Sequence, residues 1–149
     1  MTKTCDILVL NGPNLNMLGI REPHIYGHQT LADIEAKCRD MAAARNLTID
    51  WCQSNAESAL IDKLHQSYGV VEWVIVNAAG LTHTSVVLRD ALTLFPDRVI
   101  EVHLSNIHAR ESFRHTSLVS PIAKGIVAGF GAASYYMAID AITHMTLET

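Results

Sequence analysis

Glu101 and His103 are the residues of this sequence best suited to proton transfer. They lie within residues 98–104, an apolar run that predicts a β-strand, and side chains two apart on a strand point to the same face. A carboxylate beside an imidazole fixes its tautomer and favours the protonated form, a common arrangement for a general acid. The pair alone is equally compatible with a structural His–Glu contact at the end of a strand.

A second reactive group lies in a long polar loop, residues 11–29, which reads NGPNLNMLGIREPHIYGHQ. Loops between a strand and the next helix usually span roughly 2–6 residues, and longer ones in a compact domain are usually functional or disordered. The phenol of Tyr26 has a reference pKa of about 10, so it needs a stabilised anion to act as a base, and Arg21 is placed to supply the charge. Simple packing is the alternative for this tyrosine. We expect Gly19 and Gly27 to be the hinges of a mobile lid.

Anion-binding groups follow the predicted Glu–His strand. Ser105 or Asn106 can cap a short helix expected over residues 107–115, and the free N–H groups at a helix start bind anions such as carboxylates. Arg110 and Arg114 are four residues apart, so on a helix they share one face. Two such arginines most often lie on a solvated face of a helix. Beside an anion site, however, they become a clamp that binds an anionic substrate. Weaker polar candidates near other predicted strand ends are Asn14, Asn77 and His83.

The elements that must position these side chains alternate in the order (βα)5. Strands are expected over residues 7–10, 47–52, 73–77, 98–104 and 125–130. The helices between them are indicated by capping boxes at Thr30–Asp33 and Ser54–Glu57, by Asn46 and Pro96 as stop signals, and by an apolar pattern over residues 134–145. Such a chain predicts an α/β fold with a parallel sheet, helices on both faces and, most commonly, strand order 2-1-3-4-5. Its ligand site lies where the order reverses between strands 1 and 3.

The composition limits the class of protein. The 149 residues suit a single domain, residues 1–149, and only 17% are charged, which suggests that subunits bury part of the surface. The net charge of −4, without a basic run, argues against nucleic-acid binding. Three widely spaced cysteines fit a reducing cytosol, and we expect no signal peptide and no membrane span.

Other ligands have weak signals in this sequence. Gly129-Phe-Gly131 is a fragment of a dinucleotide-binding loop, but it follows the fifth predicted strand instead of the first. This fragment supports a competing interpretation, in which the protein is a non-catalytic flavin- or nucleotide-binding module. The eight histidines show no HExxH or other tight metal-ligand spacing, so no metal is expected.

Four blocks of the sequence resemble the type II 3-dehydroquinate dehydratases (type II dehydroquinases). They are NGPNLNMLGIREPHIYG, QSNAESALID, NAAGLTHTSVVLRDAL and EVHLSNIHARESFRHTSLVSPIAKGIVAGFG. The resemblance implies a flavodoxin-like three-layer sandwich and a cytoplasmic, cofactor-free lyase of the shikimate pathway. It would dehydrate 3-dehydroquinate to 3-dehydroshikimate by anti elimination through an enolate. A role in aromatic biosynthesis and a role in quinate breakdown both remain open. The second block departs from the family, with Ala56-Glu57-Ser58 where His-Glu-Gly is usual.

The resemblance also implies roles for individual residues. Tyr26 would be the base, helped by Arg21, and His103 the acid, oriented by Glu101, while Asn14 would stabilise the enolate through a water. The substrate hydroxyls and carboxylate would be held by Asn77, His83, Arg114 and the backbone at Leu104 and Ser105. Asp90 would reach the site of a neighbouring subunit, in a dodecamer built from trimers.

Overall fold

The five strands of the computed structural model form one parallel sheet in the order β2-β1-β3-β4-β5, as predicted. The structure describes residues 3–147, and for Tyr26 and Leu147 the backbone only. The strands are β1 (Cys5–Asn11), β2 (Ile49–Gln53), β3 (Val71–Asn77), β4 (Val99–His103) and β5 (Gly125–Ala128). The first and third strands are direct neighbours, so the order reverses between them.

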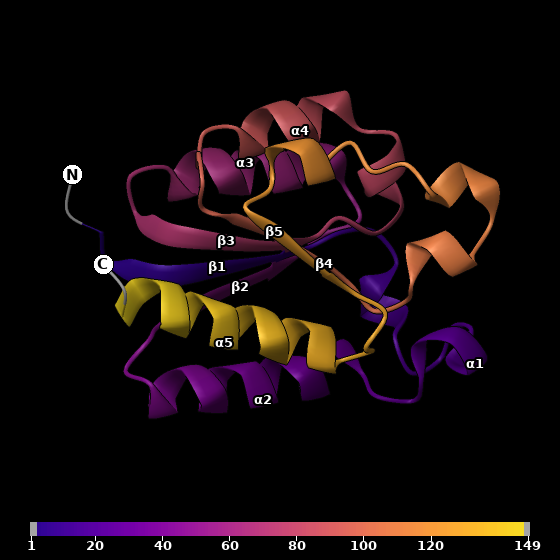
Figure 1. The fold of residues 1–149 in the computed structure, drawn as a ribbon, viewed down its shortest axis with the longest axis horizontal. Helices are drawn as coiled ribbons and strands as arrows, with labels where there is room; N and C mark the ends of the chain where they lie inside the picture. The colour runs from indigo at the N-terminus through magenta and orange to yellow at the C-terminus, as the bar shows by residue number, and fades with distance from the viewer. Residues whose placement is uncertain (1–2, 148–149) are drawn as a thin grey trace.

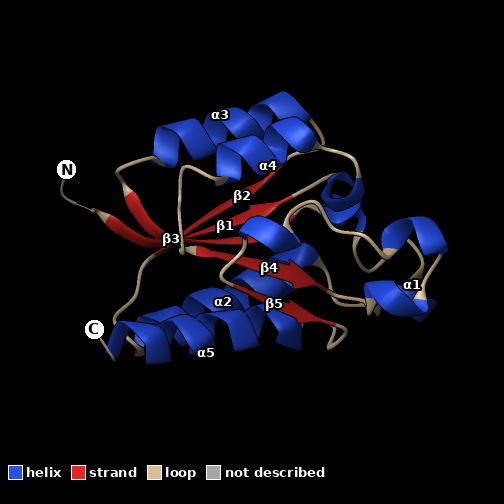
Figure 2. Ribbon diagram, turned by 45° about the horizontal axis from the view of Figure 1, so that its top comes forward, coloured by secondary structure: helices blue, strands red, loops and turns tan. Residues whose placement is uncertain are grey.

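Helices cover both faces of this sheet, which makes a three-layer, flavodoxin-like sandwich (Figures 1 and 2). One layer holds α2 (Leu31–Ala44) and α5 (Ala133–Leu147), and the opposite layer holds α3 (Glu57–Ser67) and α4 (Val86–Leu92). The short helix α1 (Pro23–Tyr26) lies apart from both layers, at the end of the molecule where the strands finish. Within residues 3–147, no helix is long and apolar enough to cross a membrane.

Two hydrophobic cores separate the layers because the side chains of a strand alternate between the two faces of the sheet. Ile7 and Val9 of β1 point into the core beneath α2 and α5, whereas Leu8 and Leu10 point into the core beneath α3 and α4. All four side chains are at most 1% exposed. This two-sided burial explains why the central strands read as continuous apolar runs.

Two local predictions of helix ends are confirmed. The Thr30 hydroxyl accepts a hydrogen bond from the backbone N–H of Asp33, and the Asp33 carboxylate accepts one from the N–H of Thr30, each at 3.1 Å. This reciprocal capping box begins α2. After the helix, Asn46 has a φ of 59°, the left-handed conformation that ends a helix.

Three predictions of local structure are wrong. Ser54 and Glu57 form no capping box; Ala56 is the N-cap of α3, and the Glu57 carboxylate accepts a hydrogen bond from the Ser85 hydroxyl at 2.6 Å. The fifth strand ends at Ala128, not at residue 130, because Gly129 turns the chain with a φ of 96°.

The third wrong prediction is the single helix over residues 107–115. The structure has two separate 3-10 turns there, Ile107–Ala109 and Ser112–Arg114. Arg110 therefore lies between the turns in extended backbone, and it does not share a helical face with Arg114. Asn106 does cap the first turn, since its side chain accepts a hydrogen bond from the N–H of His108 at 3.0 Å.

Candidate active site

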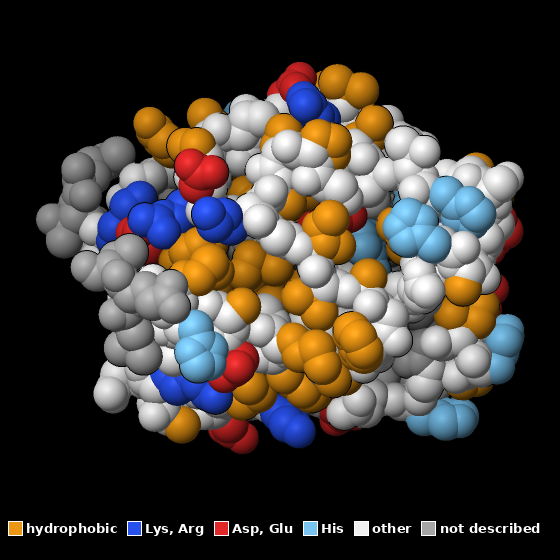
Figure 3. Space-filling view, in the orientation of Figure 1, with side chains coloured by type: hydrophobic (Ala, Val, Ile, Leu, Met, Phe, Trp, Pro, Cys, Tyr) orange, Lys and Arg blue, Asp and Glu red, His pale blue; other side chains and the backbone are white. Residues whose placement is uncertain are grey.

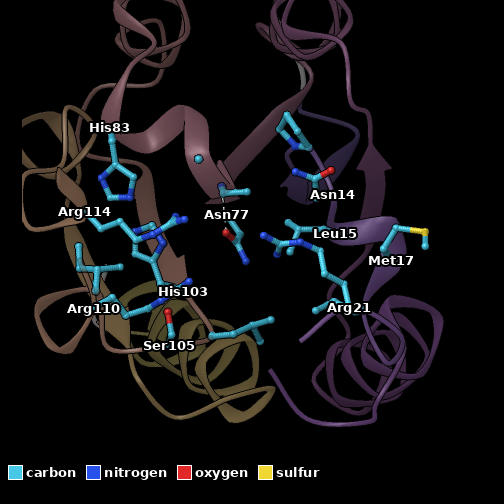
Figure 4. Close-up of a pocket in the computed structure, with 16 residues that line it drawn as sticks. Asn14, Leu15, Met17, Arg21, Asn77, His83, His103, Ser105, Arg110 and Arg114 are labelled. Atoms are coloured by element: carbon cyan, nitrogen blue, oxygen red, sulfur yellow. Dashed lines mark hydrogen bonds between the residues drawn. The ribbon is translucent and has the colours of Figure 1, made fainter. Parts of the chain in front are cut away.

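A pocket of about 130 Å³ opens at the carboxyl ends of β1, β3 and β4 (Figure 4). This is the place that the reversal of strand order predicts. Its lining comes from the three polar segments singled out in the sequence. After β1 the lining residues are Pro13, Asn14, Leu15, Met17, Leu18 and Arg21; from β3 onward they are Asn77, Ala79, Gly80 and His83; from β4 onward they are His103, Leu104, Ser105, Ile107, Arg110 and Arg114.

A buried contact between a carboxylate and an imidazole lies at the pocket end of β4. The Nε2 atom of His103 lies 2.5 Å from an Oε2 oxygen of Glu101, and the two residues are 5% and 1% exposed. Ser117 donates to the same oxygen at 2.7 Å, and Ser120 donates to the other oxygen. Burial acts to raise the pKa of Glu101, but the hydrogen bonds from His103, Ser120 and Ser117 outweigh it and leave the pKa below its ordinary value.

The ionised state of Glu101 fixes the proton on its partner. A carboxylate only accepts hydrogen bonds, so the Nε2 atom of His103 carries a hydrogen and donates it. The imidazole is thereby held in one orientation, and Nδ1 is the ring nitrogen left for chemistry in the pocket. Glu101 itself does not line the pocket; it lies behind His103.

Arginine side chains dominate the charge of the pocket. Figure 4 shows Arg110, Arg114 and His83 on one side of the cavity, and Arg21 on the other. The side chains of Arg110 and Arg114 are only 12% and 21% exposed. Glu111 contacts both, with oxygens 3.6 and 3.0 Å from their Nε atoms, and the hydrogen bond from Arg114 holds the pKa of Glu111 below its ordinary value. An anionic small molecule fits these charges.

Asn77 is anchored from beneath by a buried hydrogen-bond network. Its Nδ2 atom donates to the hydroxyl of Tyr135 at 2.9 Å, and its Oδ1 atom accepts from the N–H of Ala79 at 3.1 Å. Tyr135 in turn donates to Oδ1 of Asn11 at 2.7 Å, and burial raises the pKa of this phenol. The amide of Asn77 therefore keeps one N–H to offer to a ligand.

The loop after β1 brings Asn14 and Arg21 to the pocket. Asn14 has a φ of 71°, and its N–H donates to Oδ1 of Asn55 at 2.9 Å. Arg21 contacts Glu22, with Nη1 3.6 Å from Oε2, and Figure 4 shows its side chain extending toward the cavity. Gly19 has a φ of 89°, as a turn requires, and whether the segment moves as a lid stays a prediction.

His83 joins the pocket from the 3-10 turn Ala79–His83, which follows β3. Its Nδ1 atom lies 2.9 Å from the carbonyl oxygen of Thr116. Since a carbonyl only accepts, Nδ1 carries the hydrogen, and Nε2 is the nitrogen left for a ligand.

Besides Glu101, which lies behind His103, two predicted site residues are not placed in the pocket. The backbone of Tyr26 ends α1, but its side chain lies outside the described part of the chain. Asp90 is on α4 and does not line the pocket; its carboxylate is 65% exposed and lies 3.8 Å from Arg89. Conversely, Ser117, Ser120 and Tyr135 were not predicted, because their partners lie far away along the chain and leave no local signal.

Metal-ligating side chains do not gather at this site. Among the residues that the structure describes, no group of three or more His, Cys, Asp or Glu side chains is arranged to hold a metal ion. The surface of this part of the molecule carries several histidines, visible at the right-hand end of Figure 3.

These features define a flavodoxin-like α/β protein whose switch-point pocket is lined by arginines and by a histidine that contacts a buried carboxylate. Residues 5–143 match the family described as dehydroquinase class II, and the chain belongs to this family. It is 53% identical to a 3-dehydroquinate dehydratase of Dinoroseobacter shibae over 141 residues, 94% of each chain. It is 52% identical to that of Methylococcus capsulatus over 141 residues, 94% of this chain and 95% of the relative.

Solved structures agree with the sequence comparisons. A type II dehydroquinase from Propionibacterium acnes superposes with a TM-score of 0.88 at 37% identity, covering 97% of this chain and 99% of that one. A type II dehydroquinase from Butyrivibrio crossotus gives the same TM-score at 40% identity, covering 93% and 97%. The similarity thus extends over the sheet, both helical layers and the pocket loops.

Proposed function

We propose that this protein is a lyase that dehydrates 3-dehydroquinate to 3-dehydroshikimate by anti elimination. The observation that carries the proposal is the buried Glu101–His103 pair, which faces an arginine-lined pocket in a chain of the dehydroquinase family. Elimination beside a ketone needs a base for the acidified C–H and an acid for the departing hydroxyl. It needs no metal if the enolate is hydrogen-bonded.

The reaction has two steps in this proposal. Tyr26, as a phenolate stabilised by Arg21, removes the proton from the carbon beside the ketone, and the electron pair moves onto the carbonyl oxygen. Asn14 stabilises the resulting enolate through a water. The enolate then collapses to the conjugated enone as the hydroxyl leaves, taking a proton from His103 to become water. Glu101 stabilises the protonated imidazole and holds its orientation.

Substrate binding in this proposal uses groups on both sides of the pocket. Asn77, His83 and Arg114 hold the substrate hydroxyls, and the backbone at Leu104 and Ser105 holds the carboxylate. Arg110 adds positive charge. These residues all line the pocket, and the free N–H of Asn77 and the free ring nitrogen of His83 support their roles.

An ultraviolet assay tests the reaction, since only the enone product is conjugated. Purified protein should convert 3-dehydroquinate, and Tyr26→Phe should lower turnover by about 100-fold or more, the usual contribution of a general base. Tyr68→Phe is the matched control, because this tyrosine is 54% exposed and distant from the pocket. Turnover of Tyr26→Phe at the wild-type rate would remove the proposed base. His103→Ala should be similarly impaired while remaining folded.

We also propose that the chain assembles into trimers that form a dodecamer, with Asp90 completing the site of a neighbouring subunit. Val86 and Val87 lie on the same helix as Asp90 and are 57% and 51% exposed in the single subunit. Large apolar side chains exposed in this way are typical of a surface that a second subunit covers. Light scattering measures the mass of the assembly. Mixed oligomers of Asp90→Ala and His103→Ala subunits should regain activity, because some sites combine an intact Asp90 with an intact His103. Absence of regain in verified mixed oligomers would place Asp90 outside the site.

Other parts of the interpretation remain predictions: residues 1–149 as one domain, and a cytoplasmic location. The competing flavin- or nucleotide-binding module rests on Gly129 and Gly131. Neither residue lines the pocket. The absorbance of the purified protein separates the two functions, since bound flavin is yellow.

A further inference from the structure

Residues 116–120, which lie between the 3-10 turn Ser112–Arg114 and β5, pack against the Glu101 carboxylate. Ser117 donates a hydrogen bond to Oε2 at 2.7 Å, and Ser120 donates to Oε1. With His103 also on Oε2, the carboxylate has three donors. Neither serine lines the pocket, so neither is in a position to touch a ligand there.

We propose that Ser117 and Ser120 are positioning residues that orient the Glu101 carboxylate and, through it, the imidazole of His103. The inference rests on the proposed function for its catalytic consequence, but the orientation of His103 is measurable without any substrate. A carboxylate with donors on only one oxygen rotates about its Cγ–Cδ bond, whereas donors on both oxygens fix the plane of the carboxylate group. The serines thereby hold Oε2 where the histidine ring must meet it.

The surroundings of Glu101 make these hydroxyls indispensable. The residue is 1% exposed, and its neighbours across the sheet are Val76 of β3 and Ile126 of β5, which carry no polar side-chain group. His103 is the one titratable group that acts on it among the described residues. A buried carboxylate that loses a donor is destabilised in its charged form, so it takes up a proton at a higher pH.

The two serines differ in what else they do. The Ser117 hydroxyl also accepts hydrogen bonds from the N–H groups of Val119 and Ser120, each at 3.1 Å, so it shapes the turn itself. The side chain of Ser120 makes its hydrogen bond to Glu101 and no other in the described chain. Ser120→Ala is therefore the cleaner probe of the proposal.

The same segment also contacts the 3-10 turn Ala79–His83, which brings His83 to the pocket. The carbonyl of Thr116 accepts from Nδ1 of His83 at 2.9 Å, and the N–H of Leu118 donates to the carbonyl of Thr82 at 2.8 Å. Residues 116–120 thus contact both His83, which is proposed to bind substrate, and Glu101, which holds the proposed acid His103. A shift of this stretch changes both together, and for this reason the serine variants need a readout specific to His103.

The test combines kinetics with nitrogen NMR of the histidine rings. In Ser120→Ala, the acidic limb of the pH profile of kcat should move upward by about one pH unit, the scale of one lost hydrogen bond to a charged group. The KM should stay within about twofold of wild type, since Ser120 does not line the pocket. The ring nitrogen signals of His103, assigned with a His103→Gln variant, should shift over the same pH range as the acidic limb, because they sense the protonation of the adjacent Glu101 carboxylate. Ser120→Thr, which keeps the hydroxyl, should restore both.

Ser85→Ala is the matched control. It also removes a serine–carboxylate hydrogen bond, from Ser85 to Glu57 at 2.6 Å, and the cap of α4. It should lower stability but leave the pH dependence of kcat and the pH range over which the His103 nitrogen signals shift unchanged. Wild-type nitrogen shifts and an unmoved acidic limb in folded Ser120→Ala would overturn the proposal. If the wild-type protein fails to turn over 3-dehydroquinate, the proposed function fails, and the NMR comparison alone still decides the role of Ser120.

Discussion

Removing the hydroxyl of Tyr135 should destabilise the protein far more than the loss of one oxygen suggests. This side chain is fully buried in α5, and its hydroxyl joins Asn11 at the end of β1 to Asn77 at the end of β3. Tyr135→Phe keeps the ring and its stacking on Trp51, at 5.9 Å between centroids. The change therefore isolates the hydrogen bonds.

The magnitude follows from the two groups that lose a partner. Oδ1 of Asn11 is completely buried, and leaving it unpaired costs about 1–3 kcal/mol. Nδ2 of Asn77 borders the pocket, where water replaces part of the lost bond, so its cost lies at the lower end of the same range. We expect Tyr135→Phe to lower the free energy of unfolding by about 2–4 kcal/mol.

Urea unfolding at a fixed protein concentration measures this loss, with Tyr68→Phe as the control because its ring is 54% exposed. The control should change the free energy of unfolding by less than about 0.5 kcal/mol. Tyr135→Phe should also raise the KM for 3-dehydroquinate, since the amide of Asn77 loses its anchor. A loss no larger than that of the control would refute the reasoning that the network is a buried, satisfied unit.

Three further outcomes are expected. Because the pKa of Glu101 is lowered from its ordinary 4.5, its ionised form stabilises the fold fully above that pH, and this contribution is lost as the pH falls through the lowered value. Glu101→Gln should flatten the acid-side fall in stability, as urea midpoints across the acidic range will report; an unchanged slope would contradict the assigned pKa direction. Gly12→Ala should lower the melting temperature, since its Cβ would overlap the Ala78 carbonyl oxygen and lie 2.7 Å from the carbonyl carbon, whereas Gly125→Ala, with open space around it, should not. Metal chelators should leave turnover unchanged in the ultraviolet assay, and inhibition reversed by added metal would contradict a cofactor-free reaction.

The sequence by itself determined the elements whose signals are local. Continuous apolar runs identified the central strands, because a strand buried on both faces has no polar side to display. The capping box of Thr30 and Asp33 and the Glu101–His103 pair were both readable, since their partners are two or three residues apart. The alternation of strands and helices then sufficed to predict the sheet order and the edge that holds the pocket.

Tertiary structure decided which partner each polar side chain takes. Glu57 has the spacing of a capping residue, but folding brings the hydroxyl of Ser85, 28 residues away, to its carboxylate. Likewise, Arg110 and Arg114 have helical spacing, but the chain forms two short 3-10 turns, with Arg110 between them and Arg114 at the end of the second, and both arginines line the pocket.

The hydrogen bonds that hold the Glu101–His103 pair could not be predicted from the sequence for the same reason. Ser117 and Ser120 reach Glu101 across 16 and 19 residues, and Tyr135 reaches Asn11 across 124. Contacts at such separations have no periodicity along the chain; they exist only once the layers have packed. Residue types and local spacing were therefore enough to identify the groups that can react. The hydrogen bonds that hold these groups in place form only in the packed fold.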